Sequence, residues 1–270
     1  MASKSSHVAG LILSATKLKE TDLILTILSE SGEQIRAVAH GARKPGCKFG
    51  ARTEVFTHAK LLIRKGRNLD TLQEIQTINT RACLRTDILF SAPASVIASF
   101  AQKMSYPDAK EATLFAMTQA ALDSLESLHQ AFYANTLDEP SLINATRLLV
   151  SAYIFKIFAL HGYMPQTKVC VLCGESLSDI LKHNEHTDIK LSAHAGGFVC
   201  KSCSPGAHSA HVVQQNLHEW LYALLYSSFQ DILTFEVDTK LADTLLLAAS
   251  WWSEEYLGER VKALEFFIEF

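Results

Sequence analysis

Two cysteine pairs, Val169-Cys-Val-Leu-Cys-Gly174 and Gly196-Gly-Phe-Val-Cys-Lys-Ser-Cys203, decide the fold of the second half of this chain. The Cys-x-x-Cys spacing lets both sulfur atoms of a pair reach a single ion. The segment between the pairs can form a loop or hairpin that brings all four thiolates together. Four thiolates close a tetrahedral site around Zn²⁺ and leave no position for water or substrate. We therefore predict a structural zinc knuckle over residues 168–205, with these ligands: Cys170, Cys173, Cys200 and Cys203.

A second arrangement of the same region is a catalytic zinc site. His183-x-Glu185 followed by Cys200-x-x-Cys203 is similar to the H-x-E…P-C-x-x-C pattern of zinc deaminases, with Glu185 as the proton carrier. Val199 stands where that pattern has proline, and the first cysteine pair would have no role. A four-thiolate site also holds zinc more tightly than a three-ligand site. We favour the structural site and keep a nucleobase deaminase-like enzyme as the alternative.

The composition predicts two or three domains of unequal charge. The chain has 270 residues, of which 48% are hydrophobic and 20% charged, as in a globular protein with a sizeable core. The formal net charge is -3. Residues 1–80 hold 12 Lys and Arg against 7 Asp and Glu, whereas residues 81–270 hold 13 against 21. This asymmetry indicates a basic module joined to a larger acidic body.

The cysteine usage and the absence of an export signal predict a cytoplasmic protein. The first residues, up to His7, are polar, and the apolar run that follows them is too brief for a signal peptide. The most apolar run, Leu148 to Leu160, is interrupted by Lys156, so no membrane span is expected. Thiols stay reduced in the cytoplasm, which favours metal over disulfides for the paired cysteines. The two lone thiols, Cys47 and Cys83, are expected to be ordinary.

The first eighty residues have the pattern of a small β-barrel. Short apolar or alternating runs of strand length follow one another, and Lys65-Gly-Arg-Asn68 is a hairpin signal. Five short strands in about seventy residues suit an OB-fold, although an SH3-like barrel fits almost as well. The predicted strands are His7–Leu13, Leu23–Leu28, Gln34–His40, Val55–Ile63 and Leu69–Ile75.

From residue 90 the apolar period becomes helical. Leu142–Leu160 is apolar on nearly all sides, which is typical of a central helix buried by its neighbours. Pro140 suits its first turn and Gly162 its C-terminal end. One apolar stripe precedes this helix and two follow the knuckle. The first runs along Leu114, Ala121, Leu125 and Leu128; the two later ones are Val212, Leu217, Trp220, Leu221, Leu224 and Leu225, and Leu241, Leu245, Ala248 and Trp252.

The predicted fold class is therefore α+β. We expect an N-terminal five-stranded OB-fold barrel, residues 1–80, followed by an all-helical domain, residues 81–270. The Cys₄ zinc knuckle, residues 168–205, is inserted in the helical domain.

The cations of the first module are concentrated between residues 36 and 67. Nine Lys and Arg stand there against a single acid, Glu54. Such a cluster neutralises phosphates and gives sequence-independent affinity for nucleic acid. Phe49 and Phe56 offer faces for base stacking, although a core position is favoured for Phe56. A solvated basic loop is the alternative. The predicted nucleic-acid-binding residues are Arg36, Arg43, Lys44, Lys48, Arg52, Arg64, Lys65 and Arg67.

The aromatic helices of the second module offer a groove for a partner. An apolar groove with cations nearby accepts an acidic, hydrophobic peptide. Arg147 and Lys156 are the candidate cations. Plain helix packing is the alternative for each aromatic residue.

Several segments together resemble the RecO family of bacterial DNA repair proteins. The resemblance begins at Glu20-Thr-Asp-Leu-Ile and Val38-Ala-His-Gly-Ala-Arg-Lys-Pro45. It continues through His161-Gly-Tyr-Met-Pro165 and both cysteine pairs, and it ends at Leu257-Gly-Glu-Arg. Nearly the whole chain is covered, and residues 85–140 match only in helical character.

The resemblance implies an OB-fold, a helical domain and a zinc knuckle, with Zn²⁺ in a structural role. It implies binding to single- and double-stranded DNA, annealing of complementary strands and recombination mediation without catalysis. The implied partners are a RecR-like protein, the C-terminal tail of single-strand-binding protein, and the recombinase that is loaded at gaps. No membrane is involved, and the implied location is the cytoplasm, in association with the nucleoid. An adaptor that binds only proteins is the remaining alternative.

Overall fold

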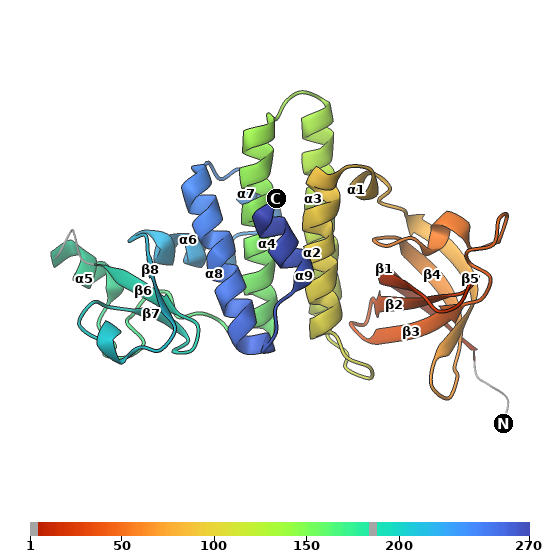
Figure 1. Cartoon of the computed structure of the whole chain (residues 1–270), viewed down its shortest axis with the longest axis horizontal. Helices are drawn as coiled ribbons and strands as arrows, with labels where there is room; N and C mark the ends of the chain where they lie inside the picture. The colour runs from red at the N-terminus through yellow and green to blue at the C-terminus, as the bar shows by residue number, and fades with distance from the viewer. Residues whose placement is uncertain (1–4, 184–187) are drawn as a thin grey trace. The chain divides into compact units, whose positions relative to one another are not determined.

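The computed structural model describes residues 5–183 and 188–270, and the chain divides into two compact units, 1–130 and 131–270. The first unit holds the N-terminal strands and the helices that follow them, and the second holds the cysteine pairs and the remaining helices (Figure 1). The predicted α+β fold class is confirmed. The predicted domain boundary at residue 80 stays a prediction.

Five strands of the first unit form a closed barrel in the order β1-β2-β3-β5-β4. All neighbours are antiparallel except β3 and β5, which pair in parallel. Closure follows because β1 is long enough to pair with β2 through its second half and with β4 through its first half. The strands are β1 (Ser5–Lys17), β2 (Leu23–Ser29), β3 (Gln34–Ala39), β4 (His58–Arg64) and β5 (Asp70–Asn79).

Alternation along the strands fills the barrel. On β3, Ile35, Ala37 and Ala39 point into the apolar core, whereas Arg36 between them is exposed. This period of two is what a strand requires when one face is buried and the other is solvated. The predicted strand from Val55 begins too early, because residues up to 57 belong to a turn that precedes β4.

The barrel is followed by three helices, which end near the boundary between the units. A buried arginine, Arg81, links the end of the barrel to α3: its guanidinium contacts Asp123 at 2.5 Å and Glu126 at 3.3 Å. The same side chain reaches the Phe56 carbonyl. The helices are α1 (Cys83–Thr86), α2 (Ile88–Met104) and α3 (Ala112–Tyr133).

The second unit is built around α4 (Glu139–Leu160), whose residues from Leu148 to Phe155 are all buried. Pro140 lies in its first turn and Gly162 follows its end with a positive φ, as predicted. Among the described residues, α4 is the one helix long and apolar enough to cross a membrane, and 72% of that window is buried, as in a core helix. It packs against these helices: α6 (Leu217–Tyr226), α7 (Phe229–Ile232) and α8 (Thr239–Leu257).

A small sheet accompanies the cysteine pairs, with strand order β7-β6-β8 (Figure 1). The predicted helical stripe through Val212 is wrong at that residue, because Val212 lies in β8 and pairs with Lys190 of β6. The helix begins only at Leu217. The remaining elements are α5 (Leu177–His183), β6 (Ile189–Ser192), β7 (Gly197–Val199), β8 (Ala210–Val213) and α9 (Lys262–Glu269).

Candidate metal centre and basic face of the barrel

The first cysteine pair lies in a tight backbone turn. The Cys170 N–H donates to the Glu175 carbonyl, and the Gly174 N–H donates back to the Cys170 carbonyl at 2.8 Å. Gly174 has a φ of +79°, a conformation that glycine adopts without strain. The turn therefore points Cys170 and Cys173 toward the same side.

The second pair follows β7 directly. Cys200 is the residue after that strand, and its N–H donates to Cys170 Sγ over 3.4 Å. The Cys203 and Ser204 N–H groups both donate to the Cys200 carbonyl, which closes a second turn. The two turns are joined because the Val171 N–H donates to the Phe198 carbonyl of β7.

The four sulfur atoms fit one metal ion. They all lie within 4.8 Å of one another, and Cys173 Sγ and Cys200 Sγ are 4.0 Å apart. A tetrahedral zinc site with bonds of about 2.3 Å separates its sulfurs by roughly 3.8 Å. The predicted ligands are thus brought together, and the cluster can hold a metal ion.

The pKa values of the neighbouring thiols move in opposite directions. Burial opposes ionisation of Cys170, but the N–H groups of Cys200, Cys173 and Leu172 outweigh it and lower the pKa of Cys170 to about 6. The hydrogen bond with Cys200 raises the pKa of Cys203 to about 12. Four neighbouring thiols ionise together only when a cation balances their charge.

Two strands, β3 and β4, bring basic residues onto one outer face of the barrel, on either side of β5. Val38 of β3 lies opposite Thr71 of β5, and Thr71 lies opposite Arg64 of β4. These residues point away from the barrel core, because Ile63 and Ala37 beside them belong to it; Arg64 is exposed, whereas Val38 is covered. Arg36 is two residues from Val38 and therefore shares this face.

The loop between β3 and β4 crosses the same face. Lys48 Nζ donates to the Gln73 carbonyl of β5 at 2.7 Å, two residues beyond Thr71. At the start of the loop, Arg43 donates to the Glu20 carbonyl at 2.9 Å. The cations of the loop are therefore held close to those of the strands.

All eight predicted nucleic-acid-binding residues are exposed. Of these eight residues, only Lys65 pairs with a carboxylate among the described residues. It contacts Asp70 at 3.0 Å, and this hydrogen bond raises the pKa of Lys65. The others keep their charge available on the surface. We refer to this set as the basic face: Arg36, Arg43, Lys44, Lys48, Arg52, Arg64, Lys65 and Arg67.

Phe49 and Phe56 do not offer faces to bases. Phe49 is 4% exposed and belongs to the core of the barrel, and Phe56 is 3% exposed. The stacking role considered for Phe49 is therefore wrong, because its ring closes the barrel beneath the loop. Lys48 lies 5.0 Å from the centroid of that ring, on its outer side.

Asp22 is the residue that the sequence interpretation missed. Its Oδ1 accepts a hydrogen bond from the Gly41 N–H at 2.8 Å, and its Oδ2 lies 2.9 Å from His40 Nδ1. These bonds fix the point at which the loop between β3 and β4, called the basic loop below, leaves β3. The Glu-x-Asp segment that carried the family resemblance was the available signal.

The two candidate cations of the second unit have internal partners. Arg147 pairs with Asp243 at 2.7 Å, and its side chain is 15% exposed. Lys156 Nζ donates to the Leu225 carbonyl at 2.8 Å, and burial lowers the pKa of Lys156. Their role in binding a partner's tail stays a prediction. Glu185 of the deaminase alternative lies outside the described residues, as does the side chain of His183.

Comparison with known families accounts for nearly the whole chain. A model described as Recombination protein O N terminal matches residues 1–81, and one described as Recombination protein O C terminal matches residues 85–265. The chain belongs to the RecO family. The resemblance inferred from its motifs is thereby confirmed.

RecO-family proteins of several bacteria are similar to this chain. DNA repair protein RecO of Bifidobacterium adolescentis is 33% identical over 192 residues, which cover 71% of this chain and 70% of that protein. DNA repair protein RecO of Bacillus cereus is 25% identical over 259 residues, which cover 96% and 95%. That of Nostoc punctiforme is 32% identical over 201 residues, which cover 73% and 62%.

Proposed function

We propose that this chain is a non-enzymatic DNA-binding recombination mediator. It anneals complementary single strands and helps to load a recombinase at gaps coated by single-strand-binding protein, in a RecF-type repair pathway. The barrel acts as an OB-fold, and the basic face binds the sugar-phosphate chain. One observation carries this proposal: of the eight exposed cations on that face, only Lys65 pairs with a carboxylate among the described residues.

Contacts of this kind suit annealing. Lysine and arginine on an open surface hold phosphates loosely and without regard to sequence. The base edges then stay free to find their complement. The burial of Phe49 and Phe56 supports this mode, since neither ring competes for the bases of a strand bound at the basic face.

The metal and the partners complete the proposal. Zn²⁺ at the four cysteines has a structural role and folds the small sheet. The partners are a RecR-like protein and the C-terminal tail of single-strand-binding protein. The protein works in the cytoplasm, in association with the nucleoid and without a membrane.

Salt dependence is the direct test of the basic face. We expect affinity for a fluorescent single strand to fall with KCl, with a log–log slope near −4 if about six phosphates are bound. The informative variant replaces Arg36, Lys44, Arg64 and Arg67 with alanine, because within residues 5–183 and 188–270 their side chains make no hydrogen bond or ion pair that would be lost. Arg43 and Lys48 are less suitable, since both also tie the loop to the barrel.

The variant should lose most of its affinity, and its slope should shrink by about 3. A matched control replaces four exposed lysines elsewhere and removes the same charge: Lys110, Lys182, Lys240 and Lys262. Equal losses of DNA affinity in both variants would mean that binding depends on the net charge of the protein and not on the basic face. Failure of the unmodified protein to bind naked DNA would favour the protein-only adaptor. A strand-annealing assay with and without single-strand-binding protein then tests the mediator role.

A further inference from the structure

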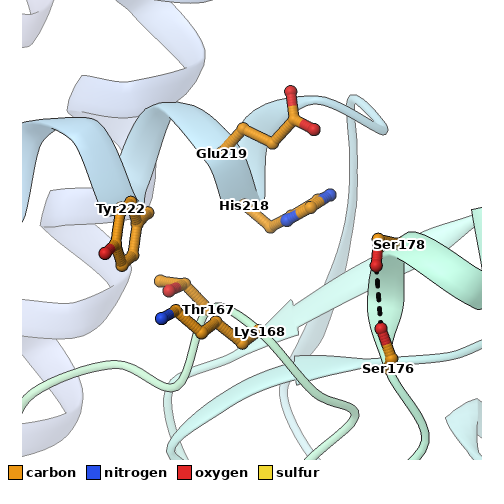
Figure 2. A pocket seen from close by; sticks show the side chains of 7 residues that line it. All are labelled: Thr167, Lys168, Ser176, Ser178, His218, Glu219 and Tyr222. Atoms are coloured by element: carbon orange, nitrogen blue, oxygen red, sulfur yellow. Dashed lines mark hydrogen bonds between the residues drawn. The ribbon is translucent and has the colours of Figure 1, made fainter.

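A cavity of about 350 Å³ lies in the second unit, between the first cysteine turn and the start of α6. Figure 2 shows Tyr222 and Lys168 on one side of it, Ser176 and Ser178 on the other, and His218 between them. Every residue of the lining carries a polar group. The lining consists of Thr167, Lys168, Ser176, Ser178, His218, Glu219 and Tyr222.

The cavity has one positive wall. Lys168 Nζ lies over the Tyr222 ring, 4.7 Å from its centroid, so a base that stacks on this face displaces the ammonium toward the adjoining phosphate. The Glu219 carboxylate points away from both (Figure 2). An anionic group near Lys168 would therefore face the cation and not the Glu219 carboxylate, although both residues line the cavity.

A second wall carries uncharged hydrogen-bonding groups. His218 is 7% exposed, burial lowers its pKa, and its ring already bonds to the Thr167 backbone, so the neutral ring leaves its other nitrogen as an acceptor. The Ser176 and Ser178 hydroxyls lie 2.8 Å apart and can turn toward a ligand. These groups suit a flat ligand with donors and acceptors at its edge.

An exposed aromatic surface continues beyond the cavity. Tyr226 lies one turn further along α6, its ring centroid is 4.5 Å from that of Tyr222, and the residue is 63% exposed. Its hydroxyl reaches Met164 Sδ, and Met164 is itself 51% exposed. A single small molecule in the cavity would leave this surface unused, whereas a chain of stacking units would cover it.

We propose that this cavity binds one unpaired nucleotide of single-stranded DNA. The base stacks on Tyr222, its edge faces His218 and the serines, and Lys168 contacts the adjoining phosphate. Tyr226 takes the neighbouring base. The inference rests on the proposed function and adds a second DNA contact, separate from the basic face.

The polar lining favours a base over the apolar side chain of a partner protein. A leucine or phenylalanine side chain would offer these groups no further partner, so the hydroxyls would keep only their mutual hydrogen bond and the imidazole only its bond to the Thr167 backbone. A base satisfies them along its edge while its face stays on the tyrosine. Stacking tolerates any base, as non-specific binding of single strands requires.

The test uses the full-length zinc-loaded protein and an oligothymidylate that carries one 2-aminopurine. Stacking on Tyr222 quenches the fluorescence of that base. Tyr222→Ala should abolish the quenching and weaken binding about tenfold, whereas Tyr222→Phe should retain both. Lys168→Ala should weaken binding and reduce its salt dependence. Tyr106→Ala, which removes a tyrosine that is 56% exposed in the first unit, is the matched control.

The outcomes separate this inference from the proposed function. If Tyr222→Ala binds and quenches like the unmodified protein while the basic-face variant loses affinity, the cavity is not a DNA site and the proposed function stands. Photo-crosslinking with 5-iodouracil should label Tyr222 or Tyr226, and labelling confined to the barrel would overturn the inference. Free thymidine monophosphate that competes as well as the oligonucleotide would also overturn it, since the site would then serve nucleotides and not a strand.

Discussion

The carboxylate of Asp22 accepts a hydrogen bond from the backbone N–H of Gly41 at 2.8 Å and so fixes the first residue of the basic loop. Gly41 has a φ of +68°, which turns the chain sharply away from β3. The next residues are tied to the same segment, since the Arg43 N–H donates to the Thr21 carbonyl. A short acidic turn before β2 thus positions a cationic loop after β3.

Replacing Asp22 with asparagine should loosen this loop. The side chain keeps its size but loses the charge that strengthens its bonds to the Gly41 N–H and His40. We expect faster hydrogen exchange at the Gly41 and Arg43 amides, with no change in the strands. Glu74→Gln, at an exposed position of β5, is the control. Unchanged exchange at Gly41 would show that the loop does not depend on this bond.

The same carboxylate makes a defined contribution to stability in acid. The Gly41 N–H and then the His40 ring lower the pKa of Asp22 from 3.8 to about 2. A depressed folded-state pKa stabilises the protein above the unfolded value, and the contribution is lost as the pH falls through the folded value. The difference in urea midpoint between the unmodified protein and Asp22→Asn should therefore be constant above about pH 5 and narrow progressively between about pH 5 and pH 1. A difference at about pH 2 as large as that at about pH 5 would contradict the assignment.

Replacing Arg81 with alanine should destabilise the first unit. The side chain is 2% exposed and contacts both Asp123 and Glu126, so its loss leaves a half-buried carboxylate without its partner. We expect a loss of roughly 3 kcal/mol in urea unfolding. Arg260 also contacts two carboxylates but is 69% exposed, and Arg260→Ala should cost less than about 1 kcal/mol. Equal effects would mean that burial does not set the strength of these pairs.

Replacing Gly197 with alanine should disturb the sheet that carries the second cysteine pair. A Cβ at this position would lie 2.5 Å from the Gln166 carbonyl oxygen, and backbone cannot move aside as a flexible side chain can. We expect a loss of about 1–3 kcal/mol and weaker metal binding. At Gly206 no atom lies within 4 Å of the added carbon, so Gly206→Ala should leave both unchanged. Thermal melting and a cobalt titration measure the two effects.

Removing the metal should unfold the small sheet without unfolding the barrel. Structural zinc contributes on the order of 10–16 kcal/mol to such knuckles. A chelator, or Cys173→Ser, should therefore abolish protection of the β6–β8 amides in hydrogen exchange. Cys83→Ser, at a thiol near Glu126, is the control. The cobalt-substituted protein should show the spectrum of four sulfur ligands, and a spectrum with nitrogen and water ligands would favour a catalytic site.

The barrel and the cysteine cluster were accessible from the sequence because local patterns encode them. Alternation along Gln34–Ala39 reports its two faces, and Cys-x-x-Cys spacing reports a shared ion. The start of β4 was misplaced because Phe56 has a φ of +67°, which ends the extended run that Val55 begins. The residue type does not indicate this conformation, because a positive φ is uncommon for phenylalanine.

Contacts between distant segments were not accessible in the same way. No local pattern pairs Asp123 with Arg81, which lies forty-two residues earlier, yet the two side chains form an ion pair. Phe49 lies in a loop of polar and glycine residues, and only the closed barrel gives it a core to enter. Each of these depends on the path of the backbone between the two partners, which periodicity does not specify.

The closure of the barrel sets an order for its folding during synthesis. β1 can pair with β4, and β3 with β5, only after the later strand of each pair has been synthesised. The closed barrel therefore cannot form until residue 79 has left the ribosome. The carboxylates that receive Arg81 emerge more than forty residues later still. Nascent chains shorter than about 126 residues therefore expose an incomplete first unit, and these are the chains that a chaperone or a protease would meet.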